Sequence, residues 1–233
     1  VAASGMDRWN SALLLAAFHN ASDVPELLAA LLHIMLTKHD VFEEFATVSR
    51  GIALVKGDDD VRPIGITGFF FKLLSAVCYA LDEPMKLLPT YQQGNAPNGC
   101  YRVIRDVRAA YDAGNSVMTI DAANAYNELS RRKAWEYIVE QGSSLQFIRA
   151  YFRLAYSTTS MTSYQHSGNS WLTIPTNVGV RQGDPCSSFI FDGTYCNALA
   201  PVIELLPPGF VPYGIHDDIT FTGNVPGNMN GIF

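Results

Sequence analysis

The sequence predicts an α+β protein, and three observations lead to that prediction. Segments with apolar residues at helical spacing occur along the whole chain. Short runs rich in Val, Ile, Thr and Tyr lie between them, and several of these runs are paired across turn-forming residues. The 233 residues are 48% hydrophobic and 16% charged, which is typical of a globular chain that buries a core without disulfides or a structural metal.

The first half of the chain is expected to be mainly helical, with one β-hairpin. Asp23 and Glu26 resemble a capping box, and Pro25 lies in the first turn, so a helix should begin there. The apolar spacing predicts helices at residues 9–19, 23–38, 68–88 and 99–113. The runs 50–56 and 61–66 predict a hairpin, and residues 90–98 predict a loop because they are rich in Gly, Pro and Asn.

The second half is expected to hold strands that end in acidic residues. Residues 116–121 predict a strand that is buried on both faces and ends at Asp121. The alternating runs 159–165 and 170–178 predict a hairpin around an HSGN turn. The runs 211–215 and 219–222 predict another hairpin. The helices of this half are expected at residues 130–141, 144–156 and 186–205.

The charge balance argues against a general nucleic-acid-binding protein, because the net charge is −6. The distribution is uneven, however: residues 99–160 carry 8 Lys and Arg against 6 Asp and Glu, and residues 161–233 carry 1 against 5. Arg102, Arg105 and Arg108 recur every three residues on one side of a predicted helix. Together with Arg131 and Arg132, they could follow the phosphates of a bound template or primer strand or form a solvated face, and the sequence leaves both interpretations open.

Several classes of protein are disfavoured by simple counts. The four cysteines have no CxxC spacing, so neither a zinc site nor a disulfide framework is expected. We therefore expect an intracellular location. No apolar run is long enough to predict a membrane span. The chain begins at Val1 and ends soon after a turn-rich run, so we expect a fragment of a longer protein.

Three carboxylates at predicted strand ends form the candidate chemical centre. Asp217 and Asp218 are adjacent in an apolar hairpin, and Asp121 ends the strand at 116–121. Adjacent acids repel each other and lose solvation when they are brought together, so a cation should offset their charge. Mg²⁺ prefers carboxylate oxygens and leaves positions open for phosphate. For the Asp217–Asp218 pair alone, the alternative is an ordinary solvated turn.

Four sequence segments, in this order, resemble the fingers and palm of a reverse transcriptase. They are VRPIG (61–65) after Lys56, DAANAYN (121–127), VRQGDPCSS (180–188) and HDD (216–218). The resemblance is strongest to the enzymes of non-LTR (LINE-type) retrotransposons. ASGMDRW (3–9) and QQGNAPNG (92–99) are similar to further segments of that family, although Met6 and Arg8 replace its usual Pro and Gly. The likeness therefore extends over nearly the whole chain.

The resemblance implies a role for each matched residue. Asp121 and Asp217 match the metal ligands of the family, and Asp218 matches a neighbouring, weaker ligand. The residues that match the nucleotide-binding positions are Lys56 and Arg62 for the triphosphate, Tyr126 for the steric gate under the sugar, and Gln182 with Gly183 beside the nucleotide and template. Each nucleotide-binding residue also has a plain structural alternative, such as a surface hairpin pair, a core aromatic residue or a helix-start loop.

The resemblance also implies an architecture and an activity. It implies a right-hand polymerase whose antiparallel palm sheet, of the ferredoxin-like or RRM-like kind, packs on helices. Residues 1–115 would form the fingers and the fingers–palm connection, and residues 116–233 the palm without its last part and without the thumb. The implied enzyme is an RNA-directed DNA polymerase, a nucleotidyltransferase that uses two Mg²⁺ ions, with Mn²⁺ as a substitute. Its partners would be an RNA template, a DNA or RNA primer and dNTPs, and its location nuclear if the source is a eukaryotic retrotransposon.

The sequence departs from the family pattern just before the two adjacent acids, and two other functions are alternatives to a reverse transcriptase. Ile215 and His216 stand where the family usually has Tyr or Phe and then a small or apolar residue, which places a titratable ring beside the acids. A viral RNA-dependent RNA polymerase is the first alternative, although such enzymes usually carry an acid where this chain has Tyr126. An inactive RT-like domain that binds RNA is the second, although all three acids are present.

Overall fold

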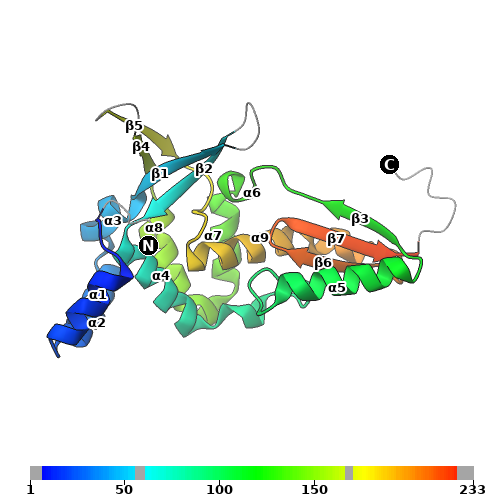
Figure 1. Cartoon of the computed structure of the whole chain (residues 1–233), viewed down its shortest axis with the longest axis horizontal. Helices are drawn as coiled ribbons and strands as arrows, with labels where there is room; N and C mark the ends of the chain where they lie inside the picture. Colours follow the sequence, from blue (N-terminus) through cyan, green and yellow to red (C-terminus); the bar gives the residue numbers. More distant parts are fainter. Residues whose placement is uncertain (1–6, 56–60, 166–169, 225–233) are drawn as a thin grey trace. The chain divides into compact units, whose positions relative to one another are not determined.

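A computed structural model describes residues 7–55, 61–165 and 170–224 (Figure 1). Its helices are α1 Ser11–Asn20, α2 Val24–Thr37, α3 His39–Thr47, α4 Phe69–Asp82, α5 Gly99–Asp112, α6 Ala125–Glu128, α7 Arg131–Glu140, α8 Gln146–Tyr156 and α9 Pro185–Glu204, with short 3-10 helices at Pro84–Leu87 and Gly142–Leu145. Its strands are β1 Val48–Val55, β2 Val61–Thr67, β3 Ser116–Ile120, β4 Ser160–Gln165, β5 Trp171–Thr176, β6 Val211–Ile215 and β7 Asp218–Gly223. The expected α+β class is confirmed, with sheets packed on helices.

The chain divides into two compact units, and each unit combines two segments of the sequence. The first unit is Val1–Glu83 with Tyr126–Ser187, and the second is Pro84–Ala125 with Ser188–Phe233. This division follows contacts within the chain and does not assign functions. The expected division into fingers at 1–115 and palm at 116–233 therefore stays a prediction.

The first unit contains a four-stranded sheet and a helical core. The strand order is β2-β1-β4-β5, in which β1 runs antiparallel to β2 and parallel to β4. Helix α8 lies at the centre of the core, because Ile148, Tyr151 and Leu154 have no exposed surface. Its apolar residues repeat at helical spacing, so that α8 packs against α3, α4 and α7.

The second unit contains a three-stranded antiparallel sheet with strand order β3-β7-β6. Helix α5 packs along this sheet and contacts all three strands (Figure 1). Ile219 and Phe221 alternate on the central strand β7 and are buried. The central position of β7 fixes where its first residue, Asp218, lies.

Most predicted elements are confirmed, and three details differ. The helix expected to reach residue 88 ends at Asp82, because Glu83 adopts a left-handed φ of 45° and the ring of Pro84 disfavours a helical residue before it. Helix α3 was not predicted from the sequence. The strand expected to be buried on both faces is instead an edge strand, and Val117 and Met118 are 39% and 40% exposed.

Two predicted turns cannot be compared with the structure. The hairpin turn after Val55, including Lys56, and the HSGN turn at 166–169 lie outside the described residues. Among the helices that are described, none has the length and apolar character needed to cross a membrane.

Candidate active site

The hairpin of β6 and β7 carries two of the three predicted acids. Ile215 pairs with Asp218, so His216 and Asp217 form a two-residue turn between the strands. His216 has a φ of 54°, in the left-handed region that favours glycine but that His enters more readily than most residues. The turn therefore places Asp217 at its tip and Asp218 at the first position of the central strand.

The third acid reaches the same end of the sheet from β3. This strand runs antiparallel to β7, with Ile120 opposite Ile219. The next residue, Asp121, therefore lies at the register position of Asp218. Asp121, Asp217 and Asp218 thus belong to one sheet and to one end of it, as the sequence predicts.

The three carboxylates affect one another electrostatically. The pKa of Asp218 lies above its ordinary value: burial is the largest cause, the charges of Asp217 and Asp121 add to it, and His216 opposes it. Burial also raises the pKa of Tyr195, and the three acids contribute to that increase. These neighbours have the same sign of charge, which is the situation in which a bound cation would be stabilising.

The donor set fits a hard divalent cation in chemistry, although the oxygens are not gathered around one point. None of the three side chains makes an ion pair or a hydrogen bond with the rest of the described chain, so their oxygens are not occupied by other donors. No three His, Cys, Asp or Glu side chains among the described residues come close enough together to hold a metal ion. Repulsion between like charges opposes closer approach of these carboxylates.

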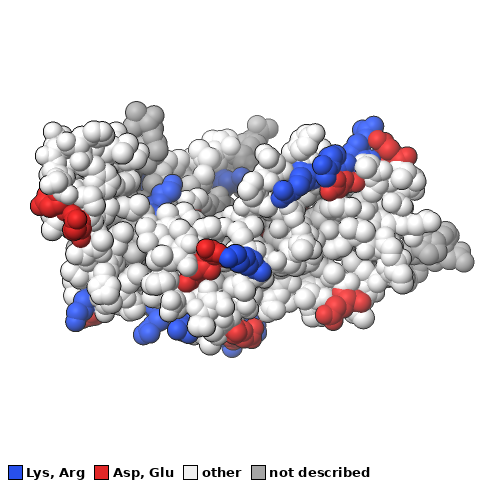
Figure 2. Space-filling model, turned by 90° about the horizontal axis from the view of Figure 1, so that it is seen from below, with Lys and Arg blue, Asp and Glu red and all other residues white. Residues whose placement is uncertain are grey.

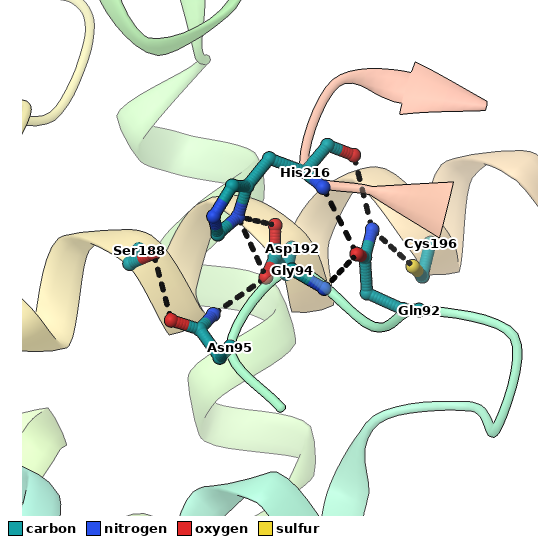
Figure 3. A network of polar contacts seen from close by, with 7 residues as sticks. All are labelled: Gln92, Gly94, Asn95, Ser188, Asp192, Cys196 and His216. Atoms are coloured by element: carbon teal, nitrogen blue, oxygen red, sulfur yellow. Dashed lines mark hydrogen bonds and ion pairs between the residues drawn. The ribbon is translucent and has the colours of Figure 1, made fainter. Parts of the chain in front are cut away.

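A buried glutamine holds the turn through its backbone (Figure 3). The N–H of His216 donates to Oε1 of Gln92 at 3.0 Å, and Nε2 of Gln92 donates to the carbonyl of His216, also at 3.0 Å. The N–H of Gly94 donates to the same Oε1 at 3.0 Å. A Cβ on Gly94 would lie 2.6 Å from Nδ1 of His216, so this approach requires glycine. Gln92 is only 2% exposed, and its amide is a fixed part of the site.

The His216 ring is held by a second set of contacts that leads into α9 (Figure 3). Its Nδ1 lies 3.0 and 3.2 Å from the two carboxylate oxygens of Asp192. Asn95 donates to Oδ2 of Asp192 at 2.6 Å and accepts from the hydroxyl of Ser188 at 3.0 Å. The hydrogen bond to Asp192 raises the pKa of His216, and burial raises the pKa of Asp192 more than His216 lowers it. The pair therefore retains its shared proton to higher pH than a free histidine would.

The roles of Gln92, Asn95 and Asp192 were not predicted from the sequence. Gln92 and Asn95 lie in QQGNAPNG, a segment whose resemblance to the family implies no role for either residue. Asp192 is a single acid in an apolar helix, FIFDGTYC, and it has no exposed surface. An acid in such a run is the one sequence feature that could have indicated a buried partner.

The other predicted site residues belong to the first unit. Arg62 is exposed on β2, opposite Leu54, and Lys56 lies outside the described residues. Tyr126 is in α6, half-buried, and its carbonyl accepts a hydrogen bond from the N–H of Val180 at 2.8 Å. This bond joins α6 to the loop that carries Gln182 and Gly183, so three of the predicted nucleotide-binding residues share one region of this unit.

Gly183 adopts a conformation that explains its residue type. Its φ is 78°, in the left-handed region, and a Cβ there would meet no neighbouring atom within 4 Å. The glycine is thus required by the backbone and not by lack of space. Gln182, the preceding residue, lines a cavity of about 310 Å³.

The arginines of α5 are mixed with acids. Figure 2 shows a row of basic groups at the right with acidic groups beside them. Arg105 contacts Asp106 at 2.8 Å, Arg108 contacts Asp112 at 3.0 Å, and Arg102 donates to the side chain of Gln93. The charge of this face is therefore partly neutralised within the helix itself.

The fold resembles solved polymerase structures at low sequence identity. Apo telomerase from Candida Tropicalis has a TM-score of 0.56 at 12% identity, covering 80% of this chain and 40% of that one. The Sicinivirus 3Dpol RNA-dependent RNA polymerase has a TM-score of 0.50 at 13% identity, covering 80% and 42%. An RNA polymerase complex inside a dsRNA virus has a TM-score of 0.55 at 12% identity, covering 81% and 19%.

These comparisons concern the fold, and the chain spans less than half the length of each of the three structures. No protein-family model and no curated protein matches the sequence. The arrangement of helices and sheets is similar to that of these solved structures, and the acids lie at one end of the antiparallel sheet of the second unit.

Proposed function

We propose that the chain is the fingers and most of the palm of an RNA-directed DNA polymerase of the non-LTR retrotransposon type. One observation carries this proposal: Asp121, Asp217 and Asp218 lie at the same end of a single antiparallel sheet. The polymerase-like fold and the order of the sequence segments support the same activity. In this proposal the enzyme is intracellular and works on an RNA template, a primer and dNTPs, in the nucleus if the element is eukaryotic.

The acids would hold two Mg²⁺ ions, with Mn²⁺ as a substitute. When bound, such ions activate the primer hydroxyl and neutralise the charge that develops on the α-phosphate and the leaving pyrophosphate. The protein contributes the positions of its carboxylates, because the turn at His216 and the register of β3 with β7 fix where they stand. The 3′-hydroxyl attacks the α-phosphorus, the P–O bond to pyrophosphate breaks, and the hydroxyl proton is lost to solvent.

The remaining predicted residues would bind and select the nucleotide. Lys56 and Arg62 would contact the triphosphate, Lys56 through a flexible ammonium group and Arg62 through a planar guanidinium that can donate two parallel hydrogen bonds. Gln182 and Gly183 would lie beside the nucleotide and the template. Tyr126 would lie under the sugar, where a ring leaves no space for a 2′-hydroxyl.

An RNA-dependent RNA polymerase is the second candidate, because viral RNA polymerases are among the proteins with a similar fold. Its sugar pocket would need a group that accepts a hydrogen bond from the 2′-hydroxyl. Tyr126 occupies the position where that alternative expects an acid, so we favour dNTPs. The two candidates make opposite predictions about which nucleotides are incorporated.

The experiment is primer extension on an RNA template with Mg²⁺, using the natural protein that contains these 233 residues. Asp217→Asn should reduce dNTP incorporation by at least about 10³-fold, because loss of a metal ligand disturbs the geometry of the transition state. Asp112→Asn is the matched control, since Asp112 is exposed at the end of α5 and forms an ion pair with Arg108 of the same helix.

Three results would contradict the proposal in different ways. Unchanged extension by Asp217→Asn would exclude the assigned metal site. A wild-type preference for rNTPs would favour the RNA polymerase. RNA binding without any extension would favour the inactive RNA-binding domain.

A further inference from the structure

The first unit contains a cavity of about 310 Å³ that none of the three proposed metal-binding acids lines, although Gln182, a proposed nucleotide- and template-contacting residue, does. Its walls come from the four-stranded sheet, from the start of α7 and from the loop at 178–182. Thr162 and Thr176 contribute hydroxyl groups, whereas Arg131 and Arg181 contribute guanidinium groups. Two cationic side chains thus border one cavity within a single unit.

Arg181 carries a buried guanidinium group. It is 8% exposed, and its three guanidinium nitrogens have no hydrogen-bond partner among the described residues. The guanidinium carbon lies 5.3 Å from the centre of the Tyr156 ring, which stabilises the charge but accepts no conventional hydrogen bond. A buried charge with five unused N–H donors is strongly disfavoured unless a ligand completes it.

Asp184, a buried acid three residues further along the chain, does not serve as that partner, because other donors occupy it. Asp184 accepts hydrogen bonds from the hydroxyls of Tyr151 at 2.6 Å, Ser187 at 3.0 Å and Tyr156 at 3.3 Å, and also from Ser75. The polar groups around Asp184 therefore satisfy one another, whereas the guanidinium of Arg181 remains outside the network.

A second guanidinium near the same ring adds positive charge without adding a carboxylate. Arg131 lies 5.2 Å from the centre of the Tyr156 ring and donates to the carbonyls of Gly179 and Thr158, each at 2.9 Å, and to the hydroxyl of Ser160 at 3.0 Å. Burial, with a further contribution from the charge of Arg181, lowers the pKa of Arg131 to about 10 although Tyr156 opposes this. The cavity thus has a positive wall that an anion would stabilise.

The chemistry of the cavity selects the kind of anion. A guanidinium group can donate two parallel hydrogen bonds to two oxygens of one phosphate group. The exposed side chain of Glu128 also lines the cavity, and its charge disfavours a highly charged triphosphate more than a singly charged phosphodiester. Apolar groups of Pro63, Ile174 and Val178 line other parts of the wall and could contact a sugar or a base.

We propose that this cavity binds one phosphodiester group of a single nucleic-acid strand and that Arg181 is its main ligand. The nature of the strand rests on the proposed function, which requires a template. The cavity itself is formed within the first unit, so its binding can be measured separately from catalysis. Arg181 is also the only Lys or Arg after Arg153 in the sequence, so no other cation of the last 80 residues could replace it.

The test measures the binding of a short fluorescent oligouridylate to the 233-residue chain by anisotropy, over a series of salt concentrations. Arg181→Met should weaken binding by at least about 10-fold, because a charge-assisted contact to phosphate is lost. The slope of log affinity against log salt should fall by about 0.7, the value for one phosphate contact on a single strand. Arg153→Met is the matched control, since Arg153 is exposed on α8, and it should change the affinity less than 2-fold.

A stability measurement separates a binding role from a structural one. Without ligand, Arg181→Met should unfold at the same or a higher temperature than the wild type, because it removes an unpaired buried charge. A large decrease in the unfolding temperature would show that Arg181 has a partner within the protein and would overturn the proposal. Unchanged affinity and unchanged salt slope in Arg181→Met would overturn it as well.

Competition distinguishes the sources of phosphate. Inorganic phosphate and dNTPs should displace the oligonucleotide only weakly if the site is built for a phosphodiester within a strand. Displacement by dNTP that disappears in Arg181→Met would instead assign the site to a nucleotide and contradict the proposal. If RNA binding depends on Arg181 but the protein fails the extension test, this inference stands and the polymerase function is rejected. If the protein extends primers but its RNA binding does not depend on Arg181, the polymerase function stands and this inference is rejected.

Discussion

His216 adopts a left-handed backbone conformation that costs about 1–2 kcal/mol for a residue with a side chain. Its N–H and carbonyl are both paired with Gln92, and its ring is paired with Asp192. Each such hydrogen bond contributes about 0.5–1.5 kcal/mol, more when a charged group takes part, so together they offset the cost of the conformation. The turn that carries Asp217 is therefore held by residues that do not themselves belong to the acidic set.

The first prediction concerns the two hydrogen bonds between the side chain of Gln92 and the backbone of His216. Gln92→Ala should lower the free energy of unfolding by about 1–3 kcal/mol, because it leaves polar backbone groups of a part-buried turn unpaired. Urea denaturation measures the difference. Gln146→Ala, at the exposed start of α8, removes the same side chain and should change stability by less than about 0.5 kcal/mol. Equal effects of the two substitutions would mean that the amide of Gln92 does not hold the turn.

The second prediction concerns sugar selection by Tyr126. Replacement by Ala or Val should increase the use of rNTPs relative to dNTPs by roughly 10–100-fold, because a clash and an unsatisfied 2′-hydroxyl each cost on the order of 1–3 kcal/mol. Competitive incorporation of the two nucleotides gives the ratio. Tyr101→Ala is the control, since Tyr101 is 69% exposed on α5. If the ratio does not move in the Tyr126 variants, Tyr126 is a packing residue.

The position of the three acids at strand ends could be predicted from the sequence, whereas the contacts that hold the turn could not. Asp121, Asp217 and Asp218 each adjoin an apolar run with β-type residues, and the ends of paired strands come together in space. Gln92 and Asp192 act through contacts with a residue 124 and 24 positions away, respectively. Such contacts depend on the tertiary fold, which no local pattern contains.

For whole helices and strands, features that depend on local sequence were predicted better than features that depend on long-range contacts. Helices such as α8 were predicted closely because their apolar spacing is a local property. The burial of β3 was predicted wrongly because an apolar strand can lie at the centre or at the edge of a sheet, and its partners decide which. Helix α4 ends six residues early because the backbone restriction before Pro84 outweighs an apolar pattern that continues.

The third prediction concerns the start of α7, which brings Arg131 to the cavity. Ser130 is the N-cap residue, and its hydroxyl accepts from the N–H of Lys133 at 3.3 Å. Ser130→Ala should therefore lower the free energy of unfolding by about 1 kcal/mol. Ser143→Ala, an exposed serine in the following 3-10 helix, should have a smaller effect in the same thermal or urea denaturation. A larger loss from Ser143→Ala would exclude the capping role of Ser130.

At the scale of the whole molecule, the net charge of −6 and the proposed nucleic-acid partners are reconciled by local charge. The acids gather at one sheet end, where a cation would neutralise them, and two guanidinium groups border a cavity in the other unit. The arginines of α5 contribute less than their number suggests, because Asp106 and Asp112 contact two of them. The sign of the charge at each site is thus more informative than the total.

The central claim is that Asp121, Asp217 and Asp218 together hold divalent cations. The most direct test is to measure Mn²⁺ binding by electron paramagnetic resonance. The 233-residue chain should bind Mn²⁺ in the presence of a dNTP, and Asp121→Asn and Asp217→Asn should each weaken that binding by at least about 10-fold. Asp112→Asn should leave it unchanged. Equal Mn²⁺ affinity in wild type and Asp217→Asn would contradict the account, because the turn between β6 and β7 would then have no part in holding a metal.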